Sequence, residues 1–296
     1  MVDMDMIELM EHYNTDDACR KTLEKLRWPD GVTCPRCQSK TIRNSYTRHQ
    51  FDCYSCGYQF SVMSGTIFHD SHLPIRKWFV AVYLMTESKK GISANQMKRT
   101  LHVSYETAWY LCHRIRAAMS DGKPNMLHGI VEVDETWVGG KAKDVGRGYR
   151  GNKAAVAGAV ERGGNVRAEV IPDTTRKTLH GFIDKYVSDD AEAIYTDEWP
   201  VYKGIADEST RHETVNHSAE EWVRGDVHTN SVENIWSLFK RSVVGSYHKV
   251  SHKHLDAYLD ELEWRFNNRK NPYLFRDTLL KLLKAENLTY QTLVAS

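Results

Sequence analysis

Long hydrophobic runs are missing from this 296-residue sequence. No stretch approaches the roughly 18 apolar residues of a membrane-spanning helix, so we expect no transmembrane segment. The acidic residues 1–11 lack the apolar core of a secretory signal. Together these absences predict a cytoplasmic protein, and disulfides are rare in that compartment. A hydrophobic content of 41% with 10% aromatic residues excludes wholesale disorder and a collagen-like chain. The length suggests two or three domains.

The chain also has almost no net charge, because 40 Lys and Arg residues oppose 39 Asp and Glu residues. The charges are unevenly distributed, however. Residues 3–30 contain eight acids and four bases, whereas residues 76–123 contain nine bases and three acids. Screening limits electrostatic attraction to about 8 Å at physiological salt, so the local excess decides contact with phosphates. The basic segment is consistent with nucleic-acid binding or with a solvated helix face, and charge alone does not separate the two.

Four of the six cysteines form two Cys-x-x-Cys pairs, Cys34 with Cys37 and Cys53 with Cys56, with fifteen residues between the pairs. Each pair can wrap two thiolates around one metal, and the two pairs together complete the tetrahedral shell that Zn²⁺ prefers. Two disulfides or four buried thiols are the alternatives, which the spacing and a reducing cytoplasm disfavour. Four protein ligands leave no position for water, so we expect a structural zinc.

The cysteine pairs predict a zinc ribbon over residues 31–66, with short strands at 46–50 and 58–62. The remaining two thiols, Cys19 and Cys112, lie at helical positions and are expected to be small core residues.

Amphipathic helical patterns follow the ribbon between residues 75 and 119. Ser93 and Ser104 suit the N-caps of the last two helices, which a short turn separates. Two short helices with a basic second helix are typical of a helix-turn-helix, which we place at residues 74–120. A plain three-helix packing module has the same periodicity, but the positive charge favours DNA binding. The candidate DNA contacts are Arg99 and three side chains expected to lie outward on the second helix: His113, Arg114 and Arg116.

After an expected linker at residues 121–125, the pattern changes to strands alternating with helices. Residues 162–165 form a hairpin turn between two of these strands. Such an order predicts a mixed α/β sheet and fits a ribonuclease H-like core, which we place at residues 128–275. The strands are predicted at 130–138, 153–161, 166–172, 193–196 and 212–216, and the helices at 175–187, 231–241 and 255–268.

Acidic residues occupy positions with a chemical meaning in this second half. Asp134 lies within the first predicted strand, and Asp197 follows the fourth. Carboxylates on adjacent strands can point at one metal cluster, and Mg²⁺ prefers a few carboxylates together with water and substrate phosphate. Glu233 offers a third carboxylate, on a helix face that it shares with Asn230 and Lys240. Two metals held there can activate a water or a 3′-hydroxyl and stabilise the leaving oxygen.

Each of these acids also has an ordinary structural interpretation. Asp134 can simply end a strand, and Asp197 can N-cap a helix that begins at Glu198. Glu233 can complete a capping box with Asn230. Each acid taken singly is compatible with either role, whereas a zinc ribbon and a helix-turn-helix upstream favour a catalytic role for the set.

With these motifs in this order, the sequence resembles bacterial insertion-sequence transposases of the IS1595 (ISXO2-like) family, within the D-D-E transposase and integrase superfamily. The resemblance covers about residues 34–269, and it implies a ribonuclease H-like catalytic fold. Each motif is short, whereas their order and combination are specific. The motifs lie at residues 34–37, 53–57, 64–66, 92–94, 133–141, 196–197, 228–237 and 265–269.

The resemblance implies cleavage at the terminal inverted repeats of the element and strand transfer into target DNA, with Mg²⁺ or Mn²⁺ as the catalytic cofactor. It matches Asp134, Asp197 and Glu233 to the three catalytic, metal-binding acids. Thirty-five residues separate Asp197 from Glu233, and Lys240 follows seven residues after Glu233, as in the D-D-E-K pattern of the superfamily.

The third catalytic position has alternatives. Some relatives have Asn there, so Asn230 and Asn234 remain alternatives to Glu233. His228 is an accessory candidate, as a ligand or phosphate contact, with a surface or capping role as its alternative. Lys240 and Arg241 are further candidate DNA contacts.

We therefore predict a DNA transposase that is cytoplasmic and nucleoid-associated, has no membrane contact, and acts as a homodimer or higher oligomer on transposon ends and target DNA. A non-catalytic DNA-binding regulator and a ribonuclease H-like nuclease are the alternatives. The remaining segments are predicted as an acidic helical segment at residues 1–30 and a C-terminal helical tail at residues 276–296.

Overall fold

The computed structural model describes residues 4–45, 47–120, 125–140, 151, 153–206, 210–216, 221 and 223–295. The chain forms two compact units, one made of Met1–Met119 with Lys270–Ser296 and the other of Ser120–Arg269. We call them the helical unit and the sheet unit. Throughout the described ranges, every helix is too short or too polar to span a lipid bilayer.

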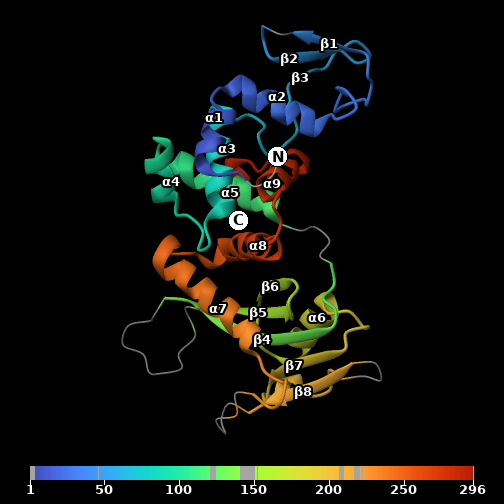
Figure 1. Ribbon diagram of the computed structural model, residues 1–296, viewed down its shortest axis with the longest axis vertical. Coiled ribbons are helices and arrows are strands. Elements are labelled where there is room, and N and C mark those ends of the chain that lie inside the picture. The colour runs from blue at the N-terminus through green and yellow to red at the C-terminus, as the bar shows by residue number, and fades with distance from the viewer. Residues whose placement is uncertain are drawn as a thin grey trace. The chain divides into compact units, whose positions relative to one another are not determined.

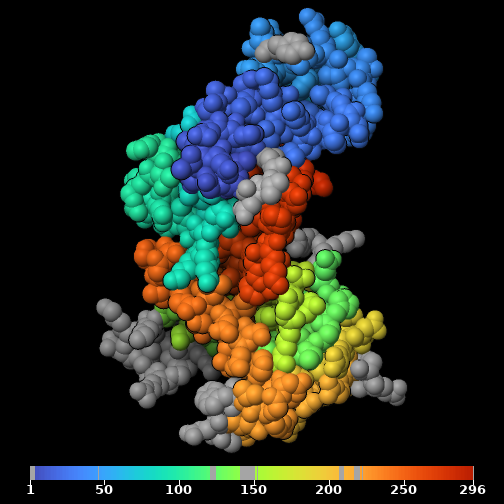
Figure 2. Space-filling model, in the orientation of Figure 1, coloured from blue at the N-terminus to red at the C-terminus, as the bar shows by residue number. Residues whose placement is uncertain are grey.

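The helical unit begins with two capped helices, as expected for residues 1–30. Asp5 accepts hydrogen bonds from the N–H groups of Ile7 and Glu8 at 2.7 and 2.9 Å and forms a capping box with Glu8. Thr15 caps the second helix. The two helices form a continuous surface, in dark blue in Figure 2. They are α1 (Met6–His12) and α2 (Asp16–Arg27).

The ribbon is a three-stranded antiparallel sheet of β1 (Ile42–Ser45), β2 (Gln50–Cys53) and β3 (Gln59–Phe60). The strand predicted at 46–50 is wrong: residues 47–49 form the turn between β1 and β2, and His49 has a φ of 54°. Tyr46 lies outside the described residues. Alternating burial starts only at Gln50, which places Phe51 and Cys53 in the ribbon core. The strand predicted at 58–62 is shortened to β3.

Three helices follow, and both predicted N-caps of the helix-turn-helix region are confirmed. Ser93 accepts a hydrogen bond from the Gln96 N–H at 3.2 Å, and Ser104 accepts one from the Thr107 N–H at 3.1 Å. His102, with a φ of 49°, makes the left-handed turn between the last two helices. These helices are α3 (Ile75–Glu87), α4 (Ala94–Leu101) and α5 (Tyr105–Met119).

The C-terminal residues return to the helical unit. Helix α9 (Leu274–Lys284) packs against α2, α3 and α5, as Figure 1 shows, and α10 (Tyr290–Ala295) follows it. The Phe275 ring lies 5.7 Å from that of Phe79 and 6.1 Å from that of Tyr13. We expected a catalytic domain up to residue 275 and then a separate tail. Instead, Lys270–Ser296 groups with the helical unit, because the apolar face of α9 is buried there.

The sheet unit contains a five-stranded mixed sheet in the order β6-β5-β4-β7-β8. Strand β5 pairs antiparallel with β4 and with β6. On the other side of β4, β7 pairs in parallel with β4, and β8 pairs in parallel with β7. All five predicted strands are confirmed, and this order is that of a ribonuclease H-like sheet. The linker predicted at 121–125 lies outside the described residues except for Asn125. The strands are β4 (Ile130–Gly139), β5 (Lys153–Glu161), β6 (Val166–Ile171), β7 (Ala193–Asp197) and β8 (Arg211–Val215).

Helices cover both faces of this sheet (Figure 1). Helix α6 (Arg176–Tyr186) packs on the face that carries Val131 and Val133 of β4. Helices α7 (Asn230–Ser242) and α8 (Leu255–Asn267) pack on the other face, where Val138 lies. Because side chains alternate along a strand, the even-numbered residues of β4 face α7. The short helical segments are Pro200–Tyr202, the π-helix Val243–Tyr247, and His252–His254.

Candidate metal sites and nucleic-acid interface

The four ribbon cysteines form one compact group. Their sulfur atoms all lie within 4.8 Å of one another, with Cys34 Sγ 3.7 Å from Cys56 Sγ and Cys37 Sγ 3.5 Å from Cys53 Sγ. A tetrahedral zinc with Zn–S bonds of about 2.3 Å requires sulfur–sulfur edges of about 3.8 Å. All four thiols are free of disulfides. The donor set and its spacing therefore fit a structural zinc, and they exclude the disulfide alternative.

The sheet places two of the predicted carboxylates, Asp134 and Asp197, side by side on neighbouring strands. Strands β4 and β7 are parallel, and Glu132 pairs with Tyr195. Two residues further along each strand stand Asp134 and Asp197, on the face that carries α7. Asp197 also accepts a hydrogen bond from the Trp199 N–H at 3.0 Å, but it is not the N-cap considered above, because the helical turn starts at Pro200 and Trp199 is its N-cap. The strand register thus places two carboxylates side by side, as the sequence predicted.

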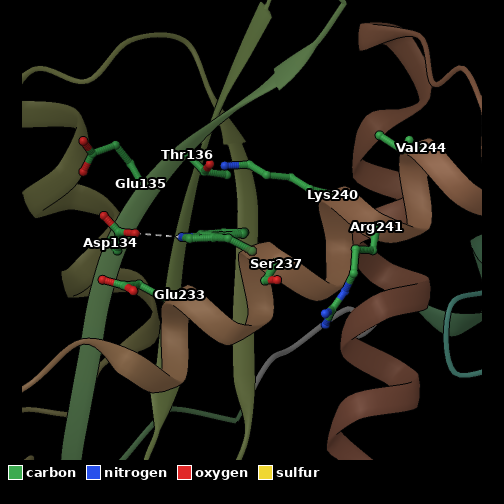
Figure 3. A pocket seen from close by; sticks show the side chains of 9 residues that line it. Asp134, Glu135, Thr136, Glu233, Ser237, Lys240, Arg241 and Val244 are labelled. Atoms are coloured by element: carbon green, nitrogen blue, oxygen red, sulfur yellow. Dashed lines mark hydrogen bonds between the residues drawn. The ribbon is translucent and has the colours of Figure 1, made fainter.

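Glu233 approaches from α7. It lines, with Asp134, a pocket of about 630 Å³. Figure 3 shows the two carboxylates next to one another and pointing the same way, while Lys240 extends toward Thr136 and Arg241 points away. Asp197 is not among the lining residues. Among the described residues, these three acids are not as tightly grouped as the ribbon thiols, which alone meet the 4.8 Å spacing.

The Asp134 carboxyl is held by an aromatic donor. Trp236 of α7 donates its indole N–H to Asp134 Oδ2 at 3.0 Å, the dashed line in Figure 3. The indole lies over Gly158 of β5, the residue that pairs with Asp134. A Cβ atom at Gly158 would lie 2.4 Å from Trp236 Cζ2, far inside van der Waals contact. Glycine at this position therefore lets the indole reach Asp134.

The surroundings of the Asp134 carboxyl disfavour its negative charge. Burial, followed by the negative charges of Glu135 and Asp197, raises the pKa of Asp134 from 3.8 to about 7. The indole hydrogen bond acts in the opposite direction. A divalent cation would neutralise such a cluster, and carboxylate oxygens are the ligands that Mg²⁺ prefers. The residues present therefore fit a Mg²⁺ or Mn²⁺ ion.

The alternative residues lie outside this pocket. Asn230 and Asn234 are exposed on α7 and do not line it. His228 Nδ1 lies 3.2 Å from Glu132 Oε1, beneath the start of α7. The capping box that we considered for Glu233 with Asn230 is absent, because Thr229 is the N-cap and makes no side-chain capping bond. Lys240 does line the pocket.

The predicted DNA contacts divide into exposed and buried residues. Arg99, Lys240 and Arg241 are exposed. The expected outward position of His113, Arg114 and Arg116 is wrong, because only 1%, 3% and 2% of these residues is exposed. Helix α5 is covered around most of its circumference, a property that its own periodicity does not reveal. Arg114 donates to the carbonyls of Ile67 and His69 instead of facing solvent.

Sequence reasoning missed two residues of the site. Trp236 was not among the predicted site residues, although it donates its indole N–H to Asp134. Glu132 was not singled out, although it is fully buried beneath α7. The available signal was its place in β4: a carboxylate two residues before Asp134 must face the same side of the strand.

Comparison with known proteins agrees with these features. The transposase zinc-ribbon domain family matches residues 14–59, and the ISXO2-like transposase domain family matches residues 126–267. An uncharacterized protein in transposable element ISH50 of Halobacterium salinarum is 31% identical over 265 residues, covering 82% of this chain and 88% of that protein. The chain belongs to the ISXO2-like transposase family. The family resemblance predicted from the motifs is thereby confirmed.

Two further similarities of this ISXO2-like transposase are more limited. An uncharacterized transposase-like protein of Haemophilus influenzae is 30% identical over 99 residues, covering 33% of this chain and 78% of that protein. A crystal structure of a pre-cleavage Mos1 transpososome aligns with 68% of this chain and 77% of its own, with 12% identity and a TM-score of 0.25, too low to support an argument. Asp134, Asp197 and Glu233 all lie in the matched transposase domain.

Proposed function

We propose that this protein binds the terminal inverted repeats of its own insertion sequence and cleaves and joins DNA strands with Mg²⁺ or Mn²⁺. The observation that supports this most directly is the position of Asp134 and Asp197 side by side on adjacent strands, with Glu233 of α7 next to Asp134 in the pocket. Three hard oxygen donors from three elements match what a two-metal phosphoryl-transfer site requires.

The residues of the chain have separate roles in this proposal. Asp134, Asp197 and Glu233 present the ligand oxygens. Divalent ions held by these oxygens would lower the pKa of the attacking water or 3′-hydroxyl and would stabilise the leaving oxygen. Trp236 keeps Asp134 in one orientation. Lys240 lines the same pocket, so its ammonium group can hold a phosphate of the DNA backbone beside the reacting bond.

DNA recognition is assigned to the helical unit. The zinc ribbon and the α4–turn–α5 segment present exposed basic side chains, including Arg99. Two element ends must be held together for transposition, so we propose that the active form is a homodimer or higher oligomer.

The test is strand cleavage of a duplex carrying the repeats that flank the gene, with and without added Mg²⁺. Omitting Mg²⁺ rather than adding a chelator leaves the ribbon zinc in place. Asp197→Asn removes a ligand charge, and Asp184→Asn, on the exposed side of α6, is the matched control. We expect Mg²⁺-dependent nicking at the repeat boundary that Asp197→Asn abolishes and Asp184→Asn retains.

Two results would contradict the proposal. Specific binding without nicking by any form of the protein would favour a DNA-binding regulator. Nicking without preference for the repeat boundary, or of RNA as well as DNA, would favour a general ribonuclease H-like nuclease.

A further inference from the structure

A buried carboxylate, Glu132, lies on the same face of β4 as Asp134. Its side chain is 0% exposed. Removing a carboxylate from water costs several kcal/mol unless hydrogen bonds and an opposite charge compensate it. The groups around Glu132 therefore show what the side chain does.

Glu132 caps helix α7 from the sheet. Its Oε2 accepts the N–H groups of Ser231 and Val232 at 2.6 and 3.2 Å, and its Oε1 accepts the Ser231 hydroxyl at 3.0 Å. Ser231 and Val232 are the second and third residues of α7. The N-cap residue Thr229 makes no side-chain capping bond, so Glu132 satisfies helix donors that otherwise have no intrahelical partner.

The same carboxylate holds the chain segment that enters α7. Arg162 donates its Nε–H to Glu132 Oε1 at 2.8 Å, which pairs the buried charge. A second Arg162 nitrogen donates to the His228 carbonyl at 3.1 Å, and the guanidinium lies 4.8 Å from the ring centre of Tyr195. His228 Nδ1 contacts the same Oε1 at 3.2 Å. Residues on both sides of the α7 start are thus fixed to β4.

We propose that Glu132 is a positioning residue of the metal site, acting through Glu233. Helix α7 is attached to β4 at two points, Glu132 with Ser231 and Val232, and Asp134 with Trp236. Glu233 lies between these two attachments along the helix. They fix the height and rotation of α7, so Glu233 faces Asp134 and can share a metal with it. This inference rests on the proposed metal-dependent function.

A purely structural role for Glu132 makes a different prediction, and the sheet unit offers a matched control. Glu263 of α8 is also a largely buried carboxylate that joins a helix to the sheet. It accepts the Ala168 N–H at 2.6 Å and pairs with Arg167 at 3.1 Å. Glu263→Gln should weaken packing in the same unit without moving the start of α7.

The experiment measures Mn²⁺ affinity of the full-length, zinc-loaded protein by the loss of the free-ion paramagnetic resonance signal. Glu132→Gln keeps the side-chain size but replaces one acceptor oxygen by an NH₂ group that faces N–H donors. We expect an affinity loss of about 10-fold or more for Glu132→Gln and a change of less than about twofold for Glu263→Gln. In a Glu233→Gln background, Glu132→Gln should cause no further loss, because its effect acts through Glu233.

Hydrogen exchange supplies a readout that is independent of metal. Glu132→Gln should speed exchange of the Ser231 and Val232 amides while the β5 amides stay protected. Unchanged Mn²⁺ affinity in Glu132→Gln, or an equal loss in the Glu233→Gln background, would overturn the inference. If Glu132→Gln exposes the β5 amides, Ser231→Ala is the deciding variant. It removes the hydroxyl bond to Glu132 and should lower Mn²⁺ affinity by about twofold to tenfold, the value of one hydrogen bond. An unchanged affinity would refute the positioning role.

An Asp134 variant distinguishes an error in the proposed metal site from an error in the positioning role of Glu132. Asp134→Asn should remove measurable Mn²⁺ binding at the site. If Asp134→Asn binds Mn²⁺ as the wild type does, the metal-site assignment itself is wrong. If Asp134→Asn loses binding and Glu132→Gln does not, only the positioning role is wrong.

Discussion

Replacing Asp134 by Asn should stabilise the sheet unit in Mg²⁺-free buffer. Burial and the charges of Glu135 and Asp197 raise the pKa of Asp134 from 3.8 to about 7. The native state therefore holds this proton more tightly than the unfolded state does, and the free energy of unfolding falls as pH rises from about 4 to about 7. Asn has no charge to lose, and its side-chain oxygen can still accept the Trp236 N–H.

The size of the effect follows from the shift. At 1.36 kcal/mol per pKa unit, the full difference of about three units corresponds to about 4 kcal/mol at pH 8. At pH 5.5 the native carboxyl is still mostly protonated, so the expected gain is only about 2 kcal/mol. These values are upper limits, because water that enters the pocket screens the charges.

Hydrogen exchange of the β5 amides, followed by mass spectrometry at the two pH values, reports the unfolding free energy of the sheet unit separately. Asp184→Asn on α6 is the control and should change neither value. Added Mg²⁺ should reverse the order, stabilising the wild type but not Asp134→Asn. Equal stability of wild type and variant at pH 8, or a gain that is the same at both pH values, would refute the electrostatic reasoning.

Three further predictions concern other parts of the protein. Gly158→Ala should destabilise the sheet unit by about 1–3 kcal/mol in urea unfolding, because the added Cβ meets the Trp236 ring. The control is Gly181→Ala on α6, where the added Cβ meets nothing within 4 Å, and it should stabilise the unit by about 0.5–1 kcal/mol. Equal effects of the two substitutions would contradict the packing argument. Cys37→Ser should abolish zinc binding in elemental analysis, whereas Cys19→Ser should retain it; retained zinc in Cys37→Ser would exclude the four-cysteine site. Lys240→Ala should lower the slope of log affinity for DNA against log salt concentration by about 1, and an unchanged slope would exclude a phosphate contact.

The sequence predicted most of what depends on spacing. The two Cys-x-x-Cys pairs predicted the zinc site, because the short loop within each pair holds its two thiols close enough to bind one ion. The five strands were readable from alternation and turn residues. The prediction that Asp134 and Asp197 lie near each other required their two strands to be neighbours. The structure shows β4 and β7 paired in parallel, with a register that places the two residues side by side.

What the sequence could not show depends on contacts between distant elements. The helical periodicity of α5 gave no sign that α3, α4 and α9 all pack against it, so His113, Arg114 and Arg116 were placed on the wrong side. The capping of α7 by Glu132 joins residues about a hundred positions apart. The local sequence gave no sign of this contact, because Thr229, Asn230 and Ser231 all suit a helix N-cap.

The return of α9 to the helical unit has a consequence for synthesis of the protein. The sheet unit is one continuous stretch, Ser120–Arg269, inserted between the two pieces of the other unit. A ribosome therefore completes the sheet unit while α3 and α5 still lack the helix that buries their apolar faces. A chain shortened at residue 270 would contain every residue of the sheet unit but lack α9, which packs against α2, α3 and α5 in the helical unit.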